Sequence, residues 1–322
     1  MAQSWQAPTL PLAYFWYGFV MEKVLLVGNF GGGNVGDELI LYYALQQSPD
    51  ATVMTVNPEY TRRFVGREDL KTMPWPPTGI RTFLKFFLSR EYRKSLTNKD
   101  ITRVVFVGGG LFAIHTYAYV VWVLVTFWLK IFSPNATFSA EHMGIDAPQN
   151  IIQRLCLRYF LRNINSVTVR DNASKMVVES MGYSAKNTED RVHVMAENTN
   201  NQAQDVVLIN ALRPMNKNDI VYIYKRFKGE NLQFVAMTER DKQYASGGMK
   251  VVYPATATEV LELYSSAKIV VGERLHSVIL GQKLSGSVYL LHSPYSQKVK
   301  HYAEEHEITE LRSTCHDASK KV

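Results

Sequence analysis

Residues 24–38 read VLLVGNFGGGNVGDE, an apolar run that passes through a glycine-rich turn into the start of a helix. Short aliphatic runs bounded by glycine are typical of buried strands. Glycines at such a junction let backbone N–H groups approach an anion or a sugar at a helix N-terminus. The stretch has neither the GxGxxG register nor the Lys-Ser/Thr pair of a P-loop. It therefore predicts a strand–turn–helix unit whose glycines serve either a tight turn or a ligand.

The same alternation of strand and helix continues along the chain, which predicts parallel sheets with crossover helices. The expected strands are 24–28, 52–56, 104–107, 137–140 and 166–169, then 206–209, 232–237, 251–252, 269–271 and 288–291. The polar segment 186–204 separates the two series. We expect an α/β fold of two Rossmann-like domains facing a cleft, with ligands beyond the carboxyl ends of the strands. The expected boundaries are an N-terminal extension (1–20), a first domain (21–190) and a second domain (191–322).

Composition limits the class of ligand. The chain has 322 residues, 46% hydrophobic and 20% charged, as in soluble globular proteins. Its net charge of +7 favours anionic partners, but no nucleic-acid motif is present, so we expect a small phosphorylated ligand or a membrane surface. The two cysteines indicate a reducing compartment and exclude a disulfide framework or a cysteine-based metal cluster.

Two segments raise the question of a membrane. Residues 117–129 contain no charge, but they are shorter than the roughly 20 residues of a spanning helix, which predicts a buried helix. Residues 81–94 (RTFLKFFLSREYRK) interleave aromatic and basic residues, which predicts an amphipathic helix. Such a helix either packs on the sheet or lies on an anionic bilayer.

Polar groups and bare backbone follow the first-half strands. Asn34 and Asp37 place hydrogen-bonding groups beside Gly36 at the first turn, where a polyol could sit. Gly109 and Gly110 follow the strand VVFV and have the same two readings as the first glycines. Arg170 precedes Asp171 at the end of the strand SVTV, where the pair either caps the next helix or faces a ligand.

The second half carries the strongest candidates. In KIVVGERLHSVILG (268–281), Arg274 and His276 directly follow a strand and open a helix. Arg213, in INALRP, follows the first strand of this half and either points into the cleft or is solvated. Arginines would hold a phosphate or carboxylate through charge-assisted hydrogen bonds of roughly 1.5–3 kcal/mol each. A histidine, with an ordinary pKa of about 6.5, is suited to proton transfer near neutral pH.

The series GNFGGGNVGDE, VGGGLF, SVTVRDNAS, INALRP and GERLHSVILG resembles the polysaccharide pyruvyl transferase family in order and spacing, and residues 296–305 are similar to its C-terminal helix. The resemblance, which covers about residues 21–306, implies a glycosyltransferase-B-like fold, with an acceptor-binding first domain and a donor-binding second domain. It implies phosphoenolpyruvate as donor and a sugar hydroxyl pair as acceptor, on a cell-surface polysaccharide or its lipid-linked precursor. Arg274 and His276 match the family's donor-binding and proton-transfer pair; Arg170 and Arg213 both remain candidates for a further donor arginine.

The resemblance sets the remaining expectations and their alternatives. No metal or cofactor is expected beyond the co-substrate, and the expected location is the cytoplasm, with peripheral attachment to the inner face of a membrane left open. The alternatives are a nucleotide-sugar glycosyltransferase and a catalytically silent sugar-binding protein. Two departures bear on them: Ala113 and Ile114 replace the family's usual Gln and Asp, and MGID (143–146) replaces Gln-Gly-Ile-Gly.

Overall fold

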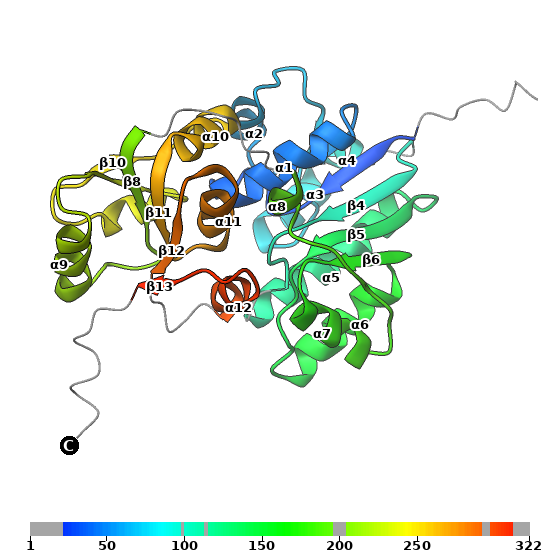
Figure 1. The fold of residues 1–322 in the computed structure, drawn as a ribbon. Coiled ribbons are helices and arrows are strands. Elements are labelled where there is room, and N and C mark those ends of the chain that lie inside the picture. Colours follow the sequence, from blue (N-terminus) through cyan, green and yellow to red (C-terminus); the bar gives the residue numbers. More distant parts are fainter. Residues whose placement is uncertain (1–21, 98–99, 113–114, 196–203, 292–296, 312–322) are drawn as a thin grey trace, which may run out of the picture.

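A computed structural model describes residues 22–97, 100–112, 115–195, 204–291 and 297–311, and these form two parallel β-sheets (Figure 1). Within the described residues the first sheet has the strand order β3-β2-β1-β4-β5-β6-β7 and the second β10-β9-β8-β11-β12-β13. Every strand pairing in both sheets is parallel. The predicted α/β class with two Rossmann-like sheets is confirmed. The predicted N-terminal extension lies outside the described residues.

The first sheet and its helices run from Val24 to Asn187. Its strands are β1 Val24–Val27, β2 Thr52–Met54, β3 Thr72–Met73, β4 Arg103–Val107, β5 Thr137–Met143, β6 Ser166–Val169 and β7 Lys186–Asn187. Its helices are α1 Val35–Gln47, α2 Pro58–Val65, α3 Ile80–Leu88, α4 Arg90–Leu96, α5 Thr116–Phe132, α6 Ile151–Arg162 and α7 Asn172–Ser180. Helix α8, Arg191–Met195, follows in the segment between the sheets and packs between α1 and α11 of the second domain.

The second sheet begins at Gln204. Its strands are β8 Gln204–Asn210, β9 Asn231–Val235, β10 Lys250–Val252, β11 Ala267–Gly272, β12 Val288–Leu291 and β13 Glu310–Leu311. Its helices are α9 Lys217–Arg226, the 3-10 helix η2 Glu239–Tyr244, α10 Ala257–Ser265, α11 Leu275–Leu284 and α12 Gln297–Glu305. The two-residue strands β3, β7 and β13 were not predicted, because so few residues carry no recognisable pattern.

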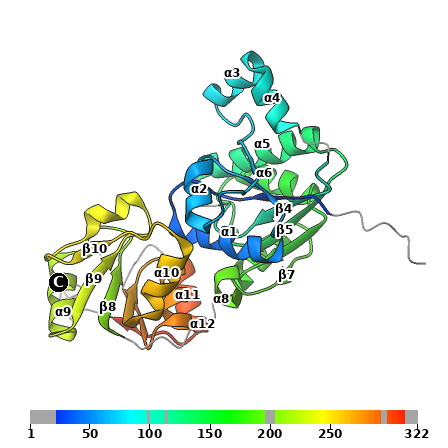
Figure 2. The ribbon, with the colours of Figure 1, turned by 90° about the horizontal axis from the view of Figure 1, so that it is seen from above.

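Alternation along the central strand separates the two faces of the first sheet. Val24 and Leu26 pack with α1, α2 and residues of the second domain, whereas Leu25 and Val27 pack with α5 and α6. Successive strand side chains point to opposite faces, so each face carries its own core. As Figure 2 shows, α1 and α8 lie toward the second domain, while α3 to α6 lie on the far side.

Two helices differ from the sequence prediction. Residues 81–94 form α3 and α4 rather than one helix, because the Ser89 hydroxyl accepts from the Tyr92 N–H and starts a new helix. Helix α5 is buried on its inner side, as expected, but Tyr117, Phe127 and Ile131 on its outer side are exposed. None of the helices in the described ranges has both the length and the apolarity that crossing a membrane requires.

The glycine-rich turn joins the two domains. The Val35 N–H donates to the carbonyl of Met237 at 2.9 Å, and the Tyr253 hydroxyl donates to the carbonyl of Gly33 at 3.0 Å. The turn that follows β1 therefore lies against the carboxyl end of β9, and the cleft edges of the two sheets face each other.

A buried carboxyl group supports this turn from inside. Glu38 is fully buried, and its Oε1 accepts from the Gly31 N–H at 2.6 Å. Its Oε2 has no hydrogen-bond partner among the described residues. Burial raises the pKa of Glu38 to about 8, more than the Gly31 hydrogen bond lowers it. The side chain is therefore largely protonated at neutral pH.

This raised pKa makes stability depend on pH. Between pH 4.5 and about 8 the folded protein retains a proton on Glu38 that the unfolded chain loses, so the free energy of unfolding falls as pH rises. Glu38→Gln keeps the acceptor for Gly31 without an ionisable group. We expect the variant to exceed the wild type in stability by on the order of a few kcal/mol at pH 8 and by little at pH 4.5. Urea unfolding across this range measures the difference; a difference that does not change with pH would contradict the assignment.

Candidate functional site

The two domains enclose a cleft of about 720 Å³ at the carboxyl ends of their strands. From the first domain it is lined by residues following β1, β4 and β6, and from the second by residues following β8, β9 and β11 together with the start of α12. Of the predicted site residues, the lining includes Asn34, Asp37, Gly110, Arg170, Arg274 and His276. Parallel strands end at one edge of their sheet, which explains how segments far apart in sequence meet here.

His276 lies at the junction of the two domains. It is in the first turn of α11, and its Nδ1 sits over Gly36 so closely that a Cβ on Gly36 would lie 2.0 Å from it. Only glycine at position 36 admits the imidazole. On the other side, Nε2 lies 3.7 Å from Asp190 Oδ2, an ion-pair distance too long for a hydrogen bond, so Nε2 has no hydrogen-bond partner among the described residues.

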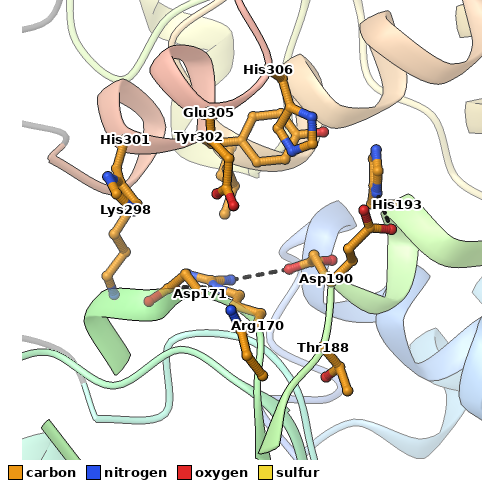
Figure 3. A pocket seen from close by; sticks show the side chains of 13 residues that line it. Arg170, Asp171, Thr188, Asp190, His193, Lys298, His301, Tyr302, Glu305 and His306 are labelled. Carbon is orange, nitrogen blue, oxygen red and sulfur yellow. Dashed lines mark hydrogen bonds and ion pairs between the residues drawn. The ribbon is translucent and has the colours of Figure 1, made fainter. Parts of the chain in front are cut away.

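Asp190 connects His276 to Arg170 and was not a predicted site residue. The Arg170 Nη1 donates to Asp190 Oδ2 at 3.2 Å (Figure 3). The Val192 N–H donates to Oδ1 at 3.0 Å. Burial alone would raise the pKa of Asp190, but His276 and Arg170 outweigh it and hold the pKa below its ordinary value. The carboxylate is therefore ionised at neutral pH. It comes from the polar segment between the sheets, where no local pattern marks it.

Arg274 is held by a second buried carboxylate. It is the N-cap residue of α11, and its Nη2 lies 2.5 Å from Oδ1 of Asp241, which is fully buried in η2. Asp241 also accepts from the backbone N–H groups of Met237 and Thr238. The Nε of Arg274 is buried without a hydrogen-bond partner among the described residues. A fixed guanidinium with an unpaired donor is suited to an anionic ligand.

Arg170 contacts Asp171 and also lines the cleft. Its Nε lies 3.5 Å from Asp171, whose carboxylate caps α7 by accepting from Ser174, and its guanidinium also lines the cleft. The guanidinium lies over Gly144, where a Cβ would approach Nη2 within 2.6 Å. The glycine of the MGID sequence, which the family pattern shares, is therefore required by the position of Arg170.

Lys298 is a cleft residue that the sequence analysis did not single out. It extends from α12 to Asp146 of the first domain, with Nζ 2.9 Å from Oδ1, and Figure 3 shows it reaching down to the first domain. Its Nζ is also close to Gly110. Burial and the nearby Arg170 lower the pKa of Lys298, and Asp146 opposes this change. In the sequence, the only feature that could have pointed to Lys298 was the similarity of residues 296–305 to the C-terminal helix of the family.

The first-domain turn contributes polar groups to the cleft. Asn34 caps α1 through its Oδ1, which accepts from the Gly36 N–H, and its Nδ2 donates to Asp37 Oδ2 at 2.8 Å. Burial raises the pKa of Asp37, and His276 and Arg170 offset only part of this rise. Gly109, with a φ of 71°, brings its backbone against the Asp37 carboxylate. Asn34, Asp37 and both glycine turns thus meet beside His276.

Arg213 has a different position from the other candidates. It is half-exposed, with Nε 3.6 Å from Glu273, and the neighbouring Leu212 rather than Arg213 lines the cleft. Ala113 and Ile114, where the sequence departs from the family, lie outside the described residues. His115, directly after them, lines the cleft.

A side pocket of about 180 Å³ adjoins the cleft and shares Arg170 and Lys298 with it (Figure 3). Its outer wall is a ring cluster of His193 from α8 with Tyr302 and His306 at α12, with ring centroids 4.2–6.0 Å apart. This cluster fixes α12, and so Lys298, against the segment that carries Asp190. The described residues contain no cluster of three or more His, Cys, Asp or Glu side chains arranged to hold a metal ion.

The contact between Gly36 and His276 can be tested by stability. Gly36→Ala adds a methyl group that overlaps the His276 ring. Because overpacking strains a folded structure, we expect the free energy of unfolding to fall by roughly 1–3 kcal/mol. Gly32→Ala is the matched control, because its Cβ would meet only the Asn29 carbonyl at 3.6 Å. Urea unfolding compares both with the wild type; equal stability of the two variants would show that His276 does not occupy this position.

Solved structures with a similar fold are sugar-nucleotide enzymes or related proteins. The UDP-GlcNAc 2-epimerase from Methanocaldococcus jannaschii has a TM-score of 0.58 at 11% identity, over 91% of this chain and 89% of that chain. The UDP-GlcNAc 2-epimerase from Neisseria meningitidis, bound to UDP-GlcNAc, has 0.56 at 11%, over 90% and 87%. HepE from Anabaena, in complex with UDP and glucose, has 0.51 at 11%, over 84% and 81%. At these identities the likeness establishes the glycosyltransferase-B-like fold and nothing about the ligand.

Sequence comparison identifies the family. Comparison with curated proteins gave no match. The profile described as "Polysaccharide pyruvyl transferase" matches residues 34–281, which is most of the chain and includes Asn34, Asp37, the second glycine turn, Arg170 and the Arg274–His276 pair. The chain therefore belongs to the polysaccharide pyruvyl transferase family and is a transferase.

Proposed function

We propose that this protein transfers the pyruvyl group of phosphoenolpyruvate to two hydroxyls of a saccharide, forming a ketal and releasing phosphate. The observation that carries the proposal is the position of His276, which lines an interdomain cleft of about 720 Å³ together with Arg170, Arg274 and Lys298. A donor with one phosphate and one carboxylate matches several fixed cations around a single proton-transfer group.

Binding of the donor falls to the cationic side chains. Arg274 has a buried Nε without a hydrogen-bond partner among the described residues, and Arg170 and Lys298 line the same cleft. Each cation is held by a carboxylate of the protein: Arg274 by Asp241, Arg170 by Asp190 and Lys298 by Asp146. The ion pairs fix the orientation of the cations before the donor arrives, which lowers the entropy cost of binding. We assign the further donor arginine to Arg170 because it lines the cleft, whereas Arg213 does not.

The chemistry requires one proton delivered to carbon. His276 protonates the terminal methylene of phosphoenolpyruvate, which makes the adjacent carbon electrophilic. One sugar hydroxyl adds to that carbon and passes its proton to the Asp37 carboxylate. The second hydroxyl oxygen then forms a bond to the same carbon, the bond from that carbon to the phosphate oxygen breaks, and phosphate leaves with the bonding pair, which completes the ketal. The second hydroxyl proton is released to the phosphate or solvent, so protons and electrons balance. Asp190 Oδ2 lies 3.7 Å from Nε2 of His276.

The acceptor is assigned to the first domain. Asn34, Asp37 and the backbone of Gly36, Gly109 and Gly110 form a polar wall on the first-domain side of the cleft. The raised pKa of Asp37 makes it a stronger base than an ordinary carboxylate, which suits it to accept a proton from a sugar hydroxyl. The acceptor is a saccharide of a cell-surface polysaccharide, free or lipid-linked, and the reaction takes place in the cytoplasm.

Ligand-induced stabilisation tests the donor. Phosphoenolpyruvate at 100 times its Kd should raise the free energy of unfolding by about 2.7 kcal/mol, measured as a thermal shift. Arg170→Gln should weaken binding by roughly 10- to 100-fold, the value of one charge-assisted contact, whereas Arg213→Gln should change it little. The comparison arm is a panel of UDP-sugars, since structural neighbours bind UDP or UDP-GlcNAc. Stabilisation by a UDP-sugar but not by phosphoenolpyruvate would favour a nucleotide-sugar glycosyltransferase instead.

Replacement of the proton donor tests the mechanism. His276→Ala should reduce phosphate release from phosphoenolpyruvate by about 10²–10⁴-fold, the usual contribution of general acid catalysis. Lys225→Ala, at an exposed position on α9 that does not line the cleft, is the control and should retain the wild-type rate. Retention of more than about a tenth of the activity by His276→Ala would remove His276 from this role. If the wild type releases no phosphate from phosphoenolpyruvate with any acceptor, the catalytically silent sugar-binding alternative is favoured.

A further inference from the structure

The far side of the first domain exposes an apolar ridge. On α5, the side chains at positions 117, 120, 124, 127 and 131 share one helical face, because they recur every three to four residues. All five are apolar or aromatic: Tyr117, Val120, Leu124, Phe127 and Ile131. Tyr117 is 72% exposed, Phe127 45% and Ile131 51%. Helix α5 itself lies on the side of the first sheet that is away from the second domain (Figure 2).

The neighbouring helix α6 continues this surface. Ile151, Ile152 and Leu155 are 66%, 53% and 59% exposed. Arg154, Arg158 and Arg162 are exposed beside them. On the other side of α5, the aromatic contacts of Phe86 with Trp128 and Phe132 fix α3 against it. Exposed apolar side chains at this density mark an interaction surface rather than the ordinary scatter of surface residues.

The charge of the molecule is concentrated on the same side. Helices α3, α4, α5 and α6 contain nine basic residues and one acidic residue, a net charge of +8. The whole chain has a net charge of +7, so everything outside these four helices sums to −1. Seven of the nine are exposed: Arg81, Lys85, Arg90, Lys94, Arg154, Arg158 and Arg162.

We propose that the surface formed by α3 to α6 docks the protein on an anionic lipid bilayer, with α5 and α6 lying in the interface. An apolar ridge flanked by basic residues matches the acyl boundary and the anionic headgroups of such a bilayer together. A second copy of the chain fits less well, because two faces of charge +8 would repel each other. A nucleic acid would match the charge but leave the isoleucines and leucines without a partner.

Docking would also place the cleft near the lipid. The starts of α5 and α6 are joined, because the Thr116 hydroxyl accepts from Asn150 Nδ2 at 3.1 Å and from Gln153 Nε2 at 3.3 Å. His115, the residue before α5, lines the cleft, and Tyr117 begins the ridge two residues later. An acceptor anchored in the bilayer would therefore enter the cleft from the ridge. This consequence rests on the proposed function, whereas docking itself does not.

Vesicle flotation tests the docking surface. The purified full chain is mixed with phosphatidylcholine vesicles, with or without about 30% phosphatidylglycerol, at low and high salt. We expect flotation with the anionic vesicles only, weakened by salt. Each basic residue at such a surface contributes about fivefold to binding, so Arg154→Gln, Arg158→Gln and Arg162→Gln together should weaken it on the order of 100-fold. Leu155→Ser should weaken it by about tenfold.

Matched control variants show whether the loss of binding depends on where the residues are replaced or only on the number of charges and apolar side chains removed. Lys225→Gln, Arg226→Gln and Lys228→Gln remove the same three charges from exposed positions at and after α9, and Val221→Ser removes an exposed apolar side chain there. These variants should bind as the wild type does. Equal losses in both sets, or no flotation at low salt, would overturn the proposal. So would a dimer in sedimentation that Leu155→Ser converts to a monomer, or binding of RNA without binding of vesicles.

Discussion

The arrangement of the cleft depends on the contact of one buried carboxylate with both domains. Asp190 lies 3.2 Å from the Arg170 guanidinium of the first domain and 3.7 Å from the His276 imidazole of the second. Removing these charges from water is costly, and the cost is offset only while opposite charges stay close. The relative position of the domains is thereby tied to the position of the proposed proton donor. Gly36 is the counterpart on the other side of the imidazole, since any larger residue would force it out of place.

The same principle recurs at the other cations of the cleft. Asp241 holds Arg274 and Asp146 holds Lys298, and in the second pair the partners belong to different domains. Carboxylates that occupy one edge of a guanidinium leave its other donors for a ligand, and the Arg274 and Arg170 side chains both line the cleft. The cleft is thus preorganised by ion pairs between segments that lie far apart in sequence. Most of its cations are already positioned for an anionic donor of the proposed kind.

The two faces of the first sheet serve different purposes in this picture. The face of α1 packs toward the second domain, and its core is continuous with residues of that domain. The face of α3 to α6 has its own core and an outer surface that is both apolar and basic. The prediction that residues 117–129 form a buried helix holds for the inner side of α5 but not for its outer side. The absence of charged residues shows that a helix is apolar, but it does not show which side of the helix faces solvent. The prediction of a basic and aromatic segment at 81–94 identified part of the proposed docking surface, although it forms two helices.

The sequence alone determined the class of fold, the family and most of the individual elements, because aliphatic runs, glycine turns and helix caps are encoded by neighbouring residues. It also identified Arg274 and His276, which a short local motif marks. It did not identify Asp190, Asp241 or Lys298, and it could not say which of Arg170 and Arg213 lines the cleft. These depend on which strand ends and helix starts the chain brings together, and for Lys298 on how α12 docks against the first domain. Charge pairing and close packing between distant segments have no periodic signature, so only the tertiary structure decided them.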